Sequence, residues 1–145
     1  MIRTDAEYEE ARRRLVDERR RIGEHESRLK GMRLSAAELK RALDPLRSFS
    51  LQLEEEVEAY ERMQRGSFEP VTDLREIGRL LVAARIYRRM SQRELAAQLE
   101  VHESQVSRDE RNEYRSISVE RAARILEVLR VGITIKMRPT EEGRR

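Results

Sequence analysis

The stretch that decides the fold of this chain is residues 91–110, which read SQRELAAQLEVHESQVSRDE. Ser91 and Glu94 have the spacing of a capping box, in which each side chain binds the backbone N–H of the other residue at the start of a helix. The apolar residues that follow recur on one helical face: Leu95, Ala96 and Leu99. A second short helix is expected over 103–110, with Val106 facing inward. Two short helices separated by a turn predict a helix-turn-helix.

These residues resemble the Cro/lambda-repressor (xenobiotic-response-element) family of helix-turn-helix DNA-binding proteins. The resemblance covers about 77–133 and rests on Ser91-Gln92-Arg93-Glu94-Leu95-Ala96, Val101 and Gln105-Val106-Ser107-Arg108-Asp109-Glu110, with Arg85 upstream. In such a motif the first helix crosses the DNA backbone and the second helix enters the major groove. The resemblance implies an all-α domain of four or five helices whose partner is double-stranded DNA.

The resemblance also implies roles for single residues. Gln92 would lie at the DNA backbone, where the free N–H groups of a helix N-terminus favour phosphate. Arg108 suits a bidentate contact to guanine, and Glu103 can accept a hydrogen bond from cytosine. Arg85 and Glu110 match a structural ion pair between the first helix and the recognition helix. The full set of expected DNA contacts is Gln92, His102, Glu103, Ser104, Gln105 and Arg108.

Three positions depart from the family pattern. Glu100 stands where a turn glycine is usual, and a left-handed backbone there costs about 1–2 kcal/mol for another residue. Asn112 replaces a second glycine, and asparagine tolerates the left-handed conformation expected at a helix end. Asp109 replaces an apolar residue, so that with Glu103 it makes the expected DNA face less positive. An alternative therefore stays open, in which the polar residues of this face belong to a helix-turn-helix that binds protein.

Residues 1–65 predict an antiparallel helical hairpin. Apolar side chains recur every seven residues over 5–30, and Ser35 begins a second helix that Pro45 is expected to break or kink. Narrow stripes of this kind are stable only when packed, so the hairpin is expected to serve dimerisation or partner binding, as a coiled coil within or across chains. The expected interface residues are Tyr8, Leu15, Ile22, Leu53, Val57 and Tyr60.

The two parts are joined by a linker at 66–70, where Gly66 and Pro70 bound the one compact cluster of helix breakers. The second domain is therefore expected over 71–145. Within it, residues 133–137 alternate between apolar and polar side chains, which predicts a short C-terminal β-strand. One strand is not stable alone, so its pairing with a second chain or its persistence as an extended tail stays open.

Composition limits the function further. Charged residues make up 41% of the chain, against roughly 25% in an average domain, and the charge is net −1 over 1–70 but net +4 over 71–145. Of the 31 basic residues 28 are arginine, which suits phosphate binding but equally follows from genomic base composition. There is no cysteine, no apolar run long enough to cross a membrane, and no phosphate-binding or catalytic motif. We expect a cytoplasmic protein that is not an enzyme and uses no metal or cofactor.

These observations favour a homodimeric, sequence-specific transcriptional regulator such as a repressor. A weaker resemblance points to the alternative of an antitoxin. Thr4-Asp5 with Tyr8, followed by Tyr60-Glu61, Gln64 and Gly66, is similar to antitoxins of the host-inhibition-of-growth type. That resemblance implies a toxin protein as a second partner beside the operator.

Overall fold

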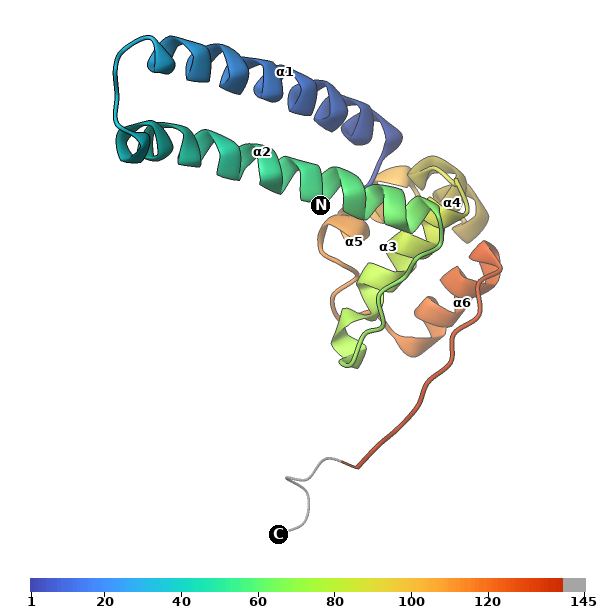
Figure 1. The fold of residues 1–145 in the computed structure, drawn as a ribbon. Helices are drawn as coiled ribbons and strands as arrows, with labels where there is room; N and C mark the ends of the chain where they lie inside the picture. The colour runs from blue at the N-terminus through green and yellow to red at the C-terminus, as the bar shows by residue number, and fades with distance from the viewer. Residues whose placement is uncertain (140–145) are drawn as a thin grey trace.

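A computed structural model describes residues 1–139, and this part of the chain is all-α. Figure 1 shows a long antiparallel hairpin that projects from a small helical domain. The hairpin consists of α1 (Asp5–Lys30) and α2 (Ala36–Gln64), and the domain consists of the 3₁₀ turn η1 (Leu74–Glu76), α3 (Ile77–Tyr87), α4 (Gln92–Leu99), α5 (Glu103–Arg111) and α6 (Val119–Leu129). The predicted hairpin and the predicted helix-turn-helix region are confirmed. The last six residues of the expected 71–145 domain lie outside the described residues.

Side-chain caps fix where the helices begin. Thr4, Ser35 and Ser91 each form a complete capping box with a glutamate three residues later. Ser118 accepts a hydrogen bond from the backbone N–H of Arg121 at the start of α6. Each cap satisfies backbone donors that a helix N-terminus otherwise leaves unpaired. The helix starts can therefore be predicted from the capping residues in the sequence.

The expected break at Pro45 is wrong. Helix α2 continues from Ala36 to Gln64 with Pro45 inside it, and Asp44 binds Lys40 at 3.0 Å instead of capping a new helix. Leu43 before the proline is fully buried, and Val57 after it is 7% exposed. Packing against α1 on both sides of the proline therefore outweighs the loss of one backbone hydrogen bond.

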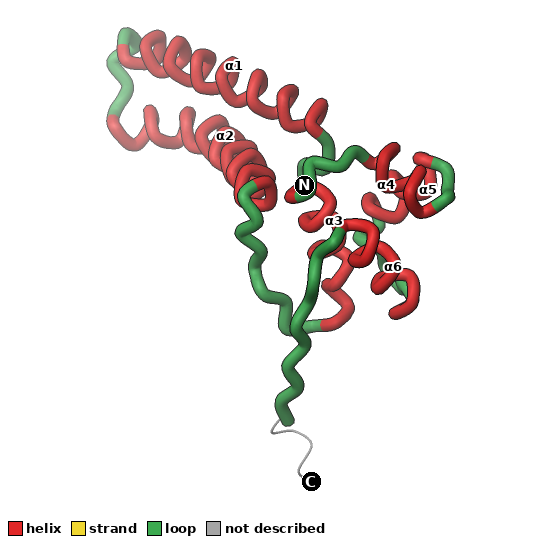
Figure 2. The backbone as a smooth tube through the Cα atoms, turned by 90° about the vertical axis from the view of Figure 1, so that its right-hand side faces the viewer, coloured by secondary structure: helices red, strands yellow, loops and turns green. Residues whose placement is uncertain are grey.

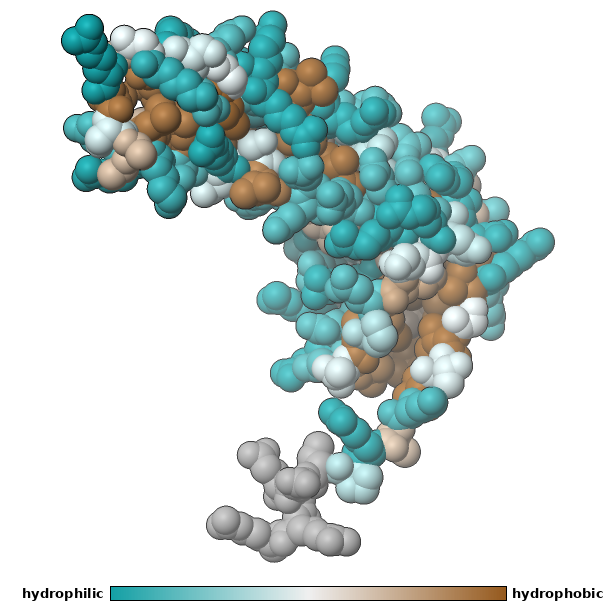
Figure 3. Space-filling model, viewed as in Figure 1, coloured by the Kyte–Doolittle hydropathy of each residue, from teal (hydrophilic) through white to brown (hydrophobic). Residues whose placement is uncertain are grey.

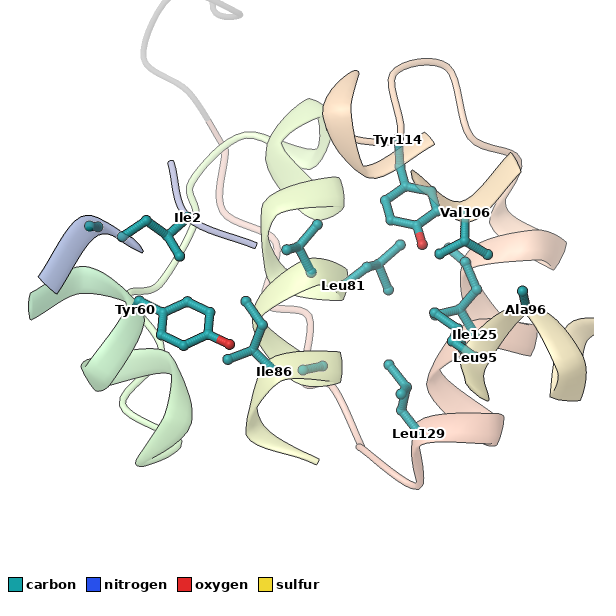
Figure 4. Close-up of a cluster of buried hydrophobic side chains, with 14 of the residues drawn as sticks. Ile2, Tyr60, Leu81, Ile86, Leu95, Ala96, Val106, Tyr114, Ile125 and Leu129 are labelled. Carbon is teal, nitrogen blue, oxygen red and sulfur yellow. The ribbon is translucent and has the colours of Figure 1, made fainter. Parts of the chain in front are cut away.

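Helix α3 lies at the centre of the core. In Figure 4, Ile2 and Tyr60 from the hairpin side lie to one side of α3, and side chains of α4, α5 and α6 lie to the other. All of these residues belong to one contiguous cluster, whose most buried members include Leu81, Leu95, Val106, Ile125 and Leu129. The base of the hairpin and the helix-turn-helix region thus share a hydrophobic core across the linker.

Helix α3 packs closely against the loop that follows α5, and the two backbones approach each other at Gly78. A Cβ atom added to Gly78 would lie 1.8 Å from the carbonyl oxygen of Glu113 and 3.0 Å from the Cβ of Tyr114. Backbone cannot yield at such a distance, so only glycine permits this packing. Tyr114 itself is 5% exposed and anchors the loop in the core.

The expected C-terminal strand is not present in the described residues. Residues 131–139 leave α6 as an extended tail, and the tube in Figure 2 shows this segment as loop. No backbone hydrogen bond joins 132–139 to another part of the described chain. An extended segment is a strand only when a neighbour supplies ladder hydrogen bonds, and within the described chain the all-α fold offers none.

Candidate nucleic-acid interface

A tight turn joins α4 to α5. Helix α4 ends at Leu99, and Glu100 takes the left-handed conformation with φ 58° before α5 begins at Glu103. The turn position at which the family usually has glycine is therefore left-handed and carries a glutamate here. Such a residue costs about 1–2 kcal/mol, which the packing of the two helices must offset.

His102 caps the N-terminus of α5. Its Nδ1 accepts a hydrogen bond from the backbone N–H of Ser104 at 3.2 Å and lies 2.8 Å from the Ser104 hydroxyl oxygen. This contact satisfies one free donor in the first turn of α5. His102 therefore orients the first turn of α5, including Ser104.

The two faces of α5 differ sharply. Val106 is 1% exposed and Glu110 is fully buried, so this side of the helix faces the core. The opposite side faces solvent, and Arg108 on it has no ion-pair partner among residues 1–139. The guanidinium donors of Arg108 are therefore available for an anionic or hydrogen-bonding ligand. The predicted DNA contacts that lie exposed are His102, Glu103, Ser104, Gln105 and Arg108.

The sequence suggested that Asp109 makes the exposed face of α5 less positive, but its carboxylate is neutralised by a neighbour. Its carboxylate forms an ion pair with Arg121 of α6, and its side chain is 23% exposed. The contact directs the charge of Asp109 toward α6 and compensates it there. The acidic residue left on the exposed side of α5 is Glu103 in the first turn, where a negative charge also favours the helix dipole.

Buried hydrogen bonds hold α3, α4 and α5 together. Arg85 donates to Glu110 from Nε at 2.5 Å and from Nη2 at 2.6 Å, and its Nη1 donates to the carbonyl oxygen of Met90 at 2.8 Å. Gln92 donates to the same Glu110 carboxylate at 2.8 Å. The expected ion pair is thus present, and Gln92 belongs to its network. A phosphate contact of Gln92 stays a prediction.

Several exposed arginines around the motif were not in the predicted set. Arg111 is three residues after Arg108 on the same exposed side of α5, a spacing that the sequence already contained. The others precede α4, lie in its first turn or follow α5, and they have no ion-pair partner in the described part of the chain: Arg88, Arg89, Arg93 and Arg115. Together they supply positive charge on both sides of the turn.

The end of α5 differs from the expected asparagine cap. Asn112 has φ −90° and is not left-handed, whereas Glu113, Tyr114 and Ser116 are, with φ between 49° and 62°. Left-handed residues other than glycine are uncommon and persist where surrounding structure holds them. Here the buried ring of Tyr114 holds the loop, and its burial raises the pKa of the hydroxyl well above the usual value.

The six expected interface residues of the hairpin have intramolecular contacts. The rings of Tyr8 and Tyr60 stack with centroids 5.0 Å apart, and their hydroxyls donate to Glu61 and Asp5 at 2.7 Å each. The hydrogen bond to Glu61 is the main cause of a raised pKa of Tyr8. Leu15, Val57 and Tyr60 are buried, and Tyr8, Ile22 and Leu53 are half-buried. Their role in binding a second chain stays a prediction.

Residues 1–139 contain no group of three or more histidine, cysteine, aspartate or glutamate side chains that could hold a metal ion. None of the helices in this part of the chain is both long and apolar enough to span a membrane.

Comparison with known families identifies the domain. The model of the helix-turn-helix family of the xenobiotic-response-element type matches residues 81–135, which include all of α4 and α5. This chain contains a helix-turn-helix domain of that family. No curated protein and no solved structure matches the chain. The helix-turn-helix domain indicates DNA binding, and proteins of this family are typically not enzymes.

Proposed function

We propose that this protein is a sequence-specific transcriptional regulator that inserts α5 into the major groove of double-stranded DNA. The observation that carries the proposal is the position of Arg108, which is exposed on α5 opposite the buried Val106 and Glu110 and has no ion-pair partner among residues 1–139. A guanidinium on a rigid helix is pre-organised for a bidentate contact with guanine, which is the commonest specific contact in the major groove. Ser104, one turn earlier on the same side, would read the neighbouring base pair.

The test compares Arg108→Ala with Arg28→Ala, a matched loss of one exposed arginine near the far end of the hairpin. Binding to an operator obtained by selection and to random DNA is measured by fluorescence anisotropy at several salt concentrations. A lost bidentate base contact costs about 1–3 kcal/mol, so Arg108→Ala should lower operator affinity roughly 5- to 150-fold and relax base preference at one position. Arg28→Ala should behave as wild type. Unchanged operator preference in Arg108→Ala would refute the role of α5.

We further propose that the protein binds DNA as a homodimer, because one recognition helix reaches only a few base pairs. An apolar groove of about 1130 Å³ lies between α6, η1 and the tail, and Figure 3 shows hydrophobic side chains gathered in this region. The tail carries alternate apolar side chains, at Val131, Ile133, Ile135 and Met137. Ile135 is 67% and Met137 is 93% exposed.

Ile133 and Ile135 of the tail line one edge of the groove, so the groove and the exposed apolar side of the tail form one continuous surface that a second chain could cover. A two-fold axis would place the tail of each chain against the groove of the other. The dimer would then bury both tails and both grooves. The occupant that this arrangement favours is a second copy of the chain. The apolar interface between α1 and α2 is less suited to binding a second chain, because Leu15, Val57 and Tyr60 are already buried within the hairpin.

Light scattering after size exclusion tests the homodimer with neighbouring substitutions. Ile135→Glu places a charge on the apolar side of the tail, and Thr134→Glu places the same charge on the next residue, which alternation points the other way. We expect a dimer for wild type and Thr134→Glu and a monomer for Ile135→Glu. A monomeric wild type, or an Ile135→Glu variant that remains dimeric, would contradict this interface. The binding of a toxin protein by the hairpin stays a prediction.

A further inference from the structure

Ile2, close to the start of the sequence, lies in the core beside the helix-turn-helix region. Ile2 is 5% exposed and belongs to the same hydrophobic cluster as Tyr60 and Ile86, and Figure 4 shows it beside α3. In the sequence, Ile2 stands more than sixty positions before α3, on the other side of the linker. Residues 2–5, the N-terminal segment, are therefore a structural part of both the hairpin and the helix-turn-helix region.

One backbone group of this segment enters the buried ion-pair network. The carbonyl oxygen of Arg3 accepts a hydrogen bond from Nη2 of Arg85 at 2.8 Å. The same guanidinium holds Glu110 of α5 and the Met90 carbonyl before α4, and Glu110 in turn holds Gln92. Arg85 is 3% exposed, so water cannot readily replace the Arg3 carbonyl as its acceptor.

The segment is also fixed to the base of the hairpin. The hydroxyl of Tyr60 in α2 donates to the carboxylate of Asp5 at 2.7 Å, two residues after the Arg3 carbonyl. The backbone N–H groups of Arg3 and Thr4 both donate to Glu7 in the first turn of α1. A displacement of the base of α1 relative to α2 therefore moves the acceptor that Arg85 requires.

We infer that the N-terminal segment is a positioning element of the DNA-binding site: through the Arg3 carbonyl and Arg85 it fixes the placement of Gln92 and α5. The inference goes beyond the proposed DNA binding and rests on it only for its functional consequence. A ligand that shifts the base of the hairpin changes DNA affinity, and DNA changes the affinity for that ligand by the same factor.

The test replaces Ile2 and observes Arg85 in the free full-length protein. The Nε–H proton of a buried, paired arginine exchanges slowly with solvent and gives its own NMR signal. Ile2→Asp should detach the segment, accelerate exchange at Arg85 Nε–H and at the α5 amides, and lower operator affinity about tenfold, within the usual range of coupling between sites. Ile2→Leu, which keeps an apolar side chain, should show the exchange rates and the operator affinity of the wild type. Exchange at wild-type rates in Ile2→Asp would overturn the inference.

A second pair of variants covers the case in which Ile2→Asp does not fold. Tyr60→Phe removes the hydroxyl that donates to Asp5, and Tyr8→Phe removes the neighbouring hydroxyl that donates to Glu61. Faster exchange at Arg85 in Tyr60→Phe than in Tyr8→Phe supports the coupling, and equal rates overturn it. Because exchange is read without DNA, a failure of the coupling is distinguishable from a failure of the proposed DNA binding.

Discussion

Replacing Glu110 with leucine should destabilise the protein by about 3 kcal/mol. Glu110 is fully buried and accepts three hydrogen bonds, two from Arg85 and one from Gln92. Removing one partner of a buried ion pair typically costs about 3–5 kcal/mol, because the other charge stays buried without compensation. The Met90 and Arg3 carbonyls still bind the guanidinium, which places the expectation at the lower end of that range.

Urea unfolding followed by circular dichroism measures this effect. A loss of about 3 kcal/mol is a large part of the roughly 5–15 kcal/mol that stabilises a domain. The double variant Arg85→Met/Glu110→Leu removes both charges and should recover most of the loss, which gives a coupling energy above about 2 kcal/mol. The exposed pair of Arg13 and Glu10 is the control, since Glu10→Leu should cost less than about 1 kcal/mol. A loss below about 1 kcal/mol for Glu110→Leu, or additive single variants, would refute the reasoning.

Three further predictions follow from the backbone and the caps. Gly78→Ala should lower the free energy of unfolding by more than about 2 kcal/mol, since its Cβ would overlap the Glu113 carbonyl; a wild-type urea midpoint would contradict this. Glu100→Gly should raise the stability by about 1 kcal/mol, measured by thermal unfolding, because Glu100 is left-handed. Hydrogen bonds from the Ser91 backbone and hydroxyl hold the pKa of Glu94 below its usual 4.5. The stability that ionised Glu94 contributes to the folded state is present above pH 4.5 and is lost as the pH falls further. Glu94→Gln should therefore flatten the acid side of a plot of melting temperature against pH.

Local signals in the sequence were sufficient for most of the helical fold. A capping box satisfies backbone donors within four residues, so Ser35 and Ser91 mark helix starts without any tertiary information. The spacing of apolar residues likewise predicted that Val106 and Leu95 would be buried. The left-handed position of Glu100 in the turn and the ion pair of Arg85 came from the family resemblance.

The errors arose where tertiary contacts outweighed local preferences. Pro45 remains within α2 because α1 packs against both halves of that helix, and no local signal shows this. The alternating residues of 133–137 form no strand in the described chain because a strand requires a neighbour. The contact of Asp109 with Arg121 and the arrival of the Arg3 carbonyl at Arg85 join distant parts of the chain, which one sequence cannot reveal.

Selection of bound fragments from a random DNA pool shows whether α5 reads DNA sequence. The full-length protein is incubated with the pool at physiological salt, and bound fragments are recovered and sequenced over several rounds. If α5 reads DNA sequence, we expect enrichment of one motif, arranged as two inverted half-sites about 34–36 Å apart, with guanine at the position that Arg108 contacts. A bound population with the same base composition as the starting pool would contradict it.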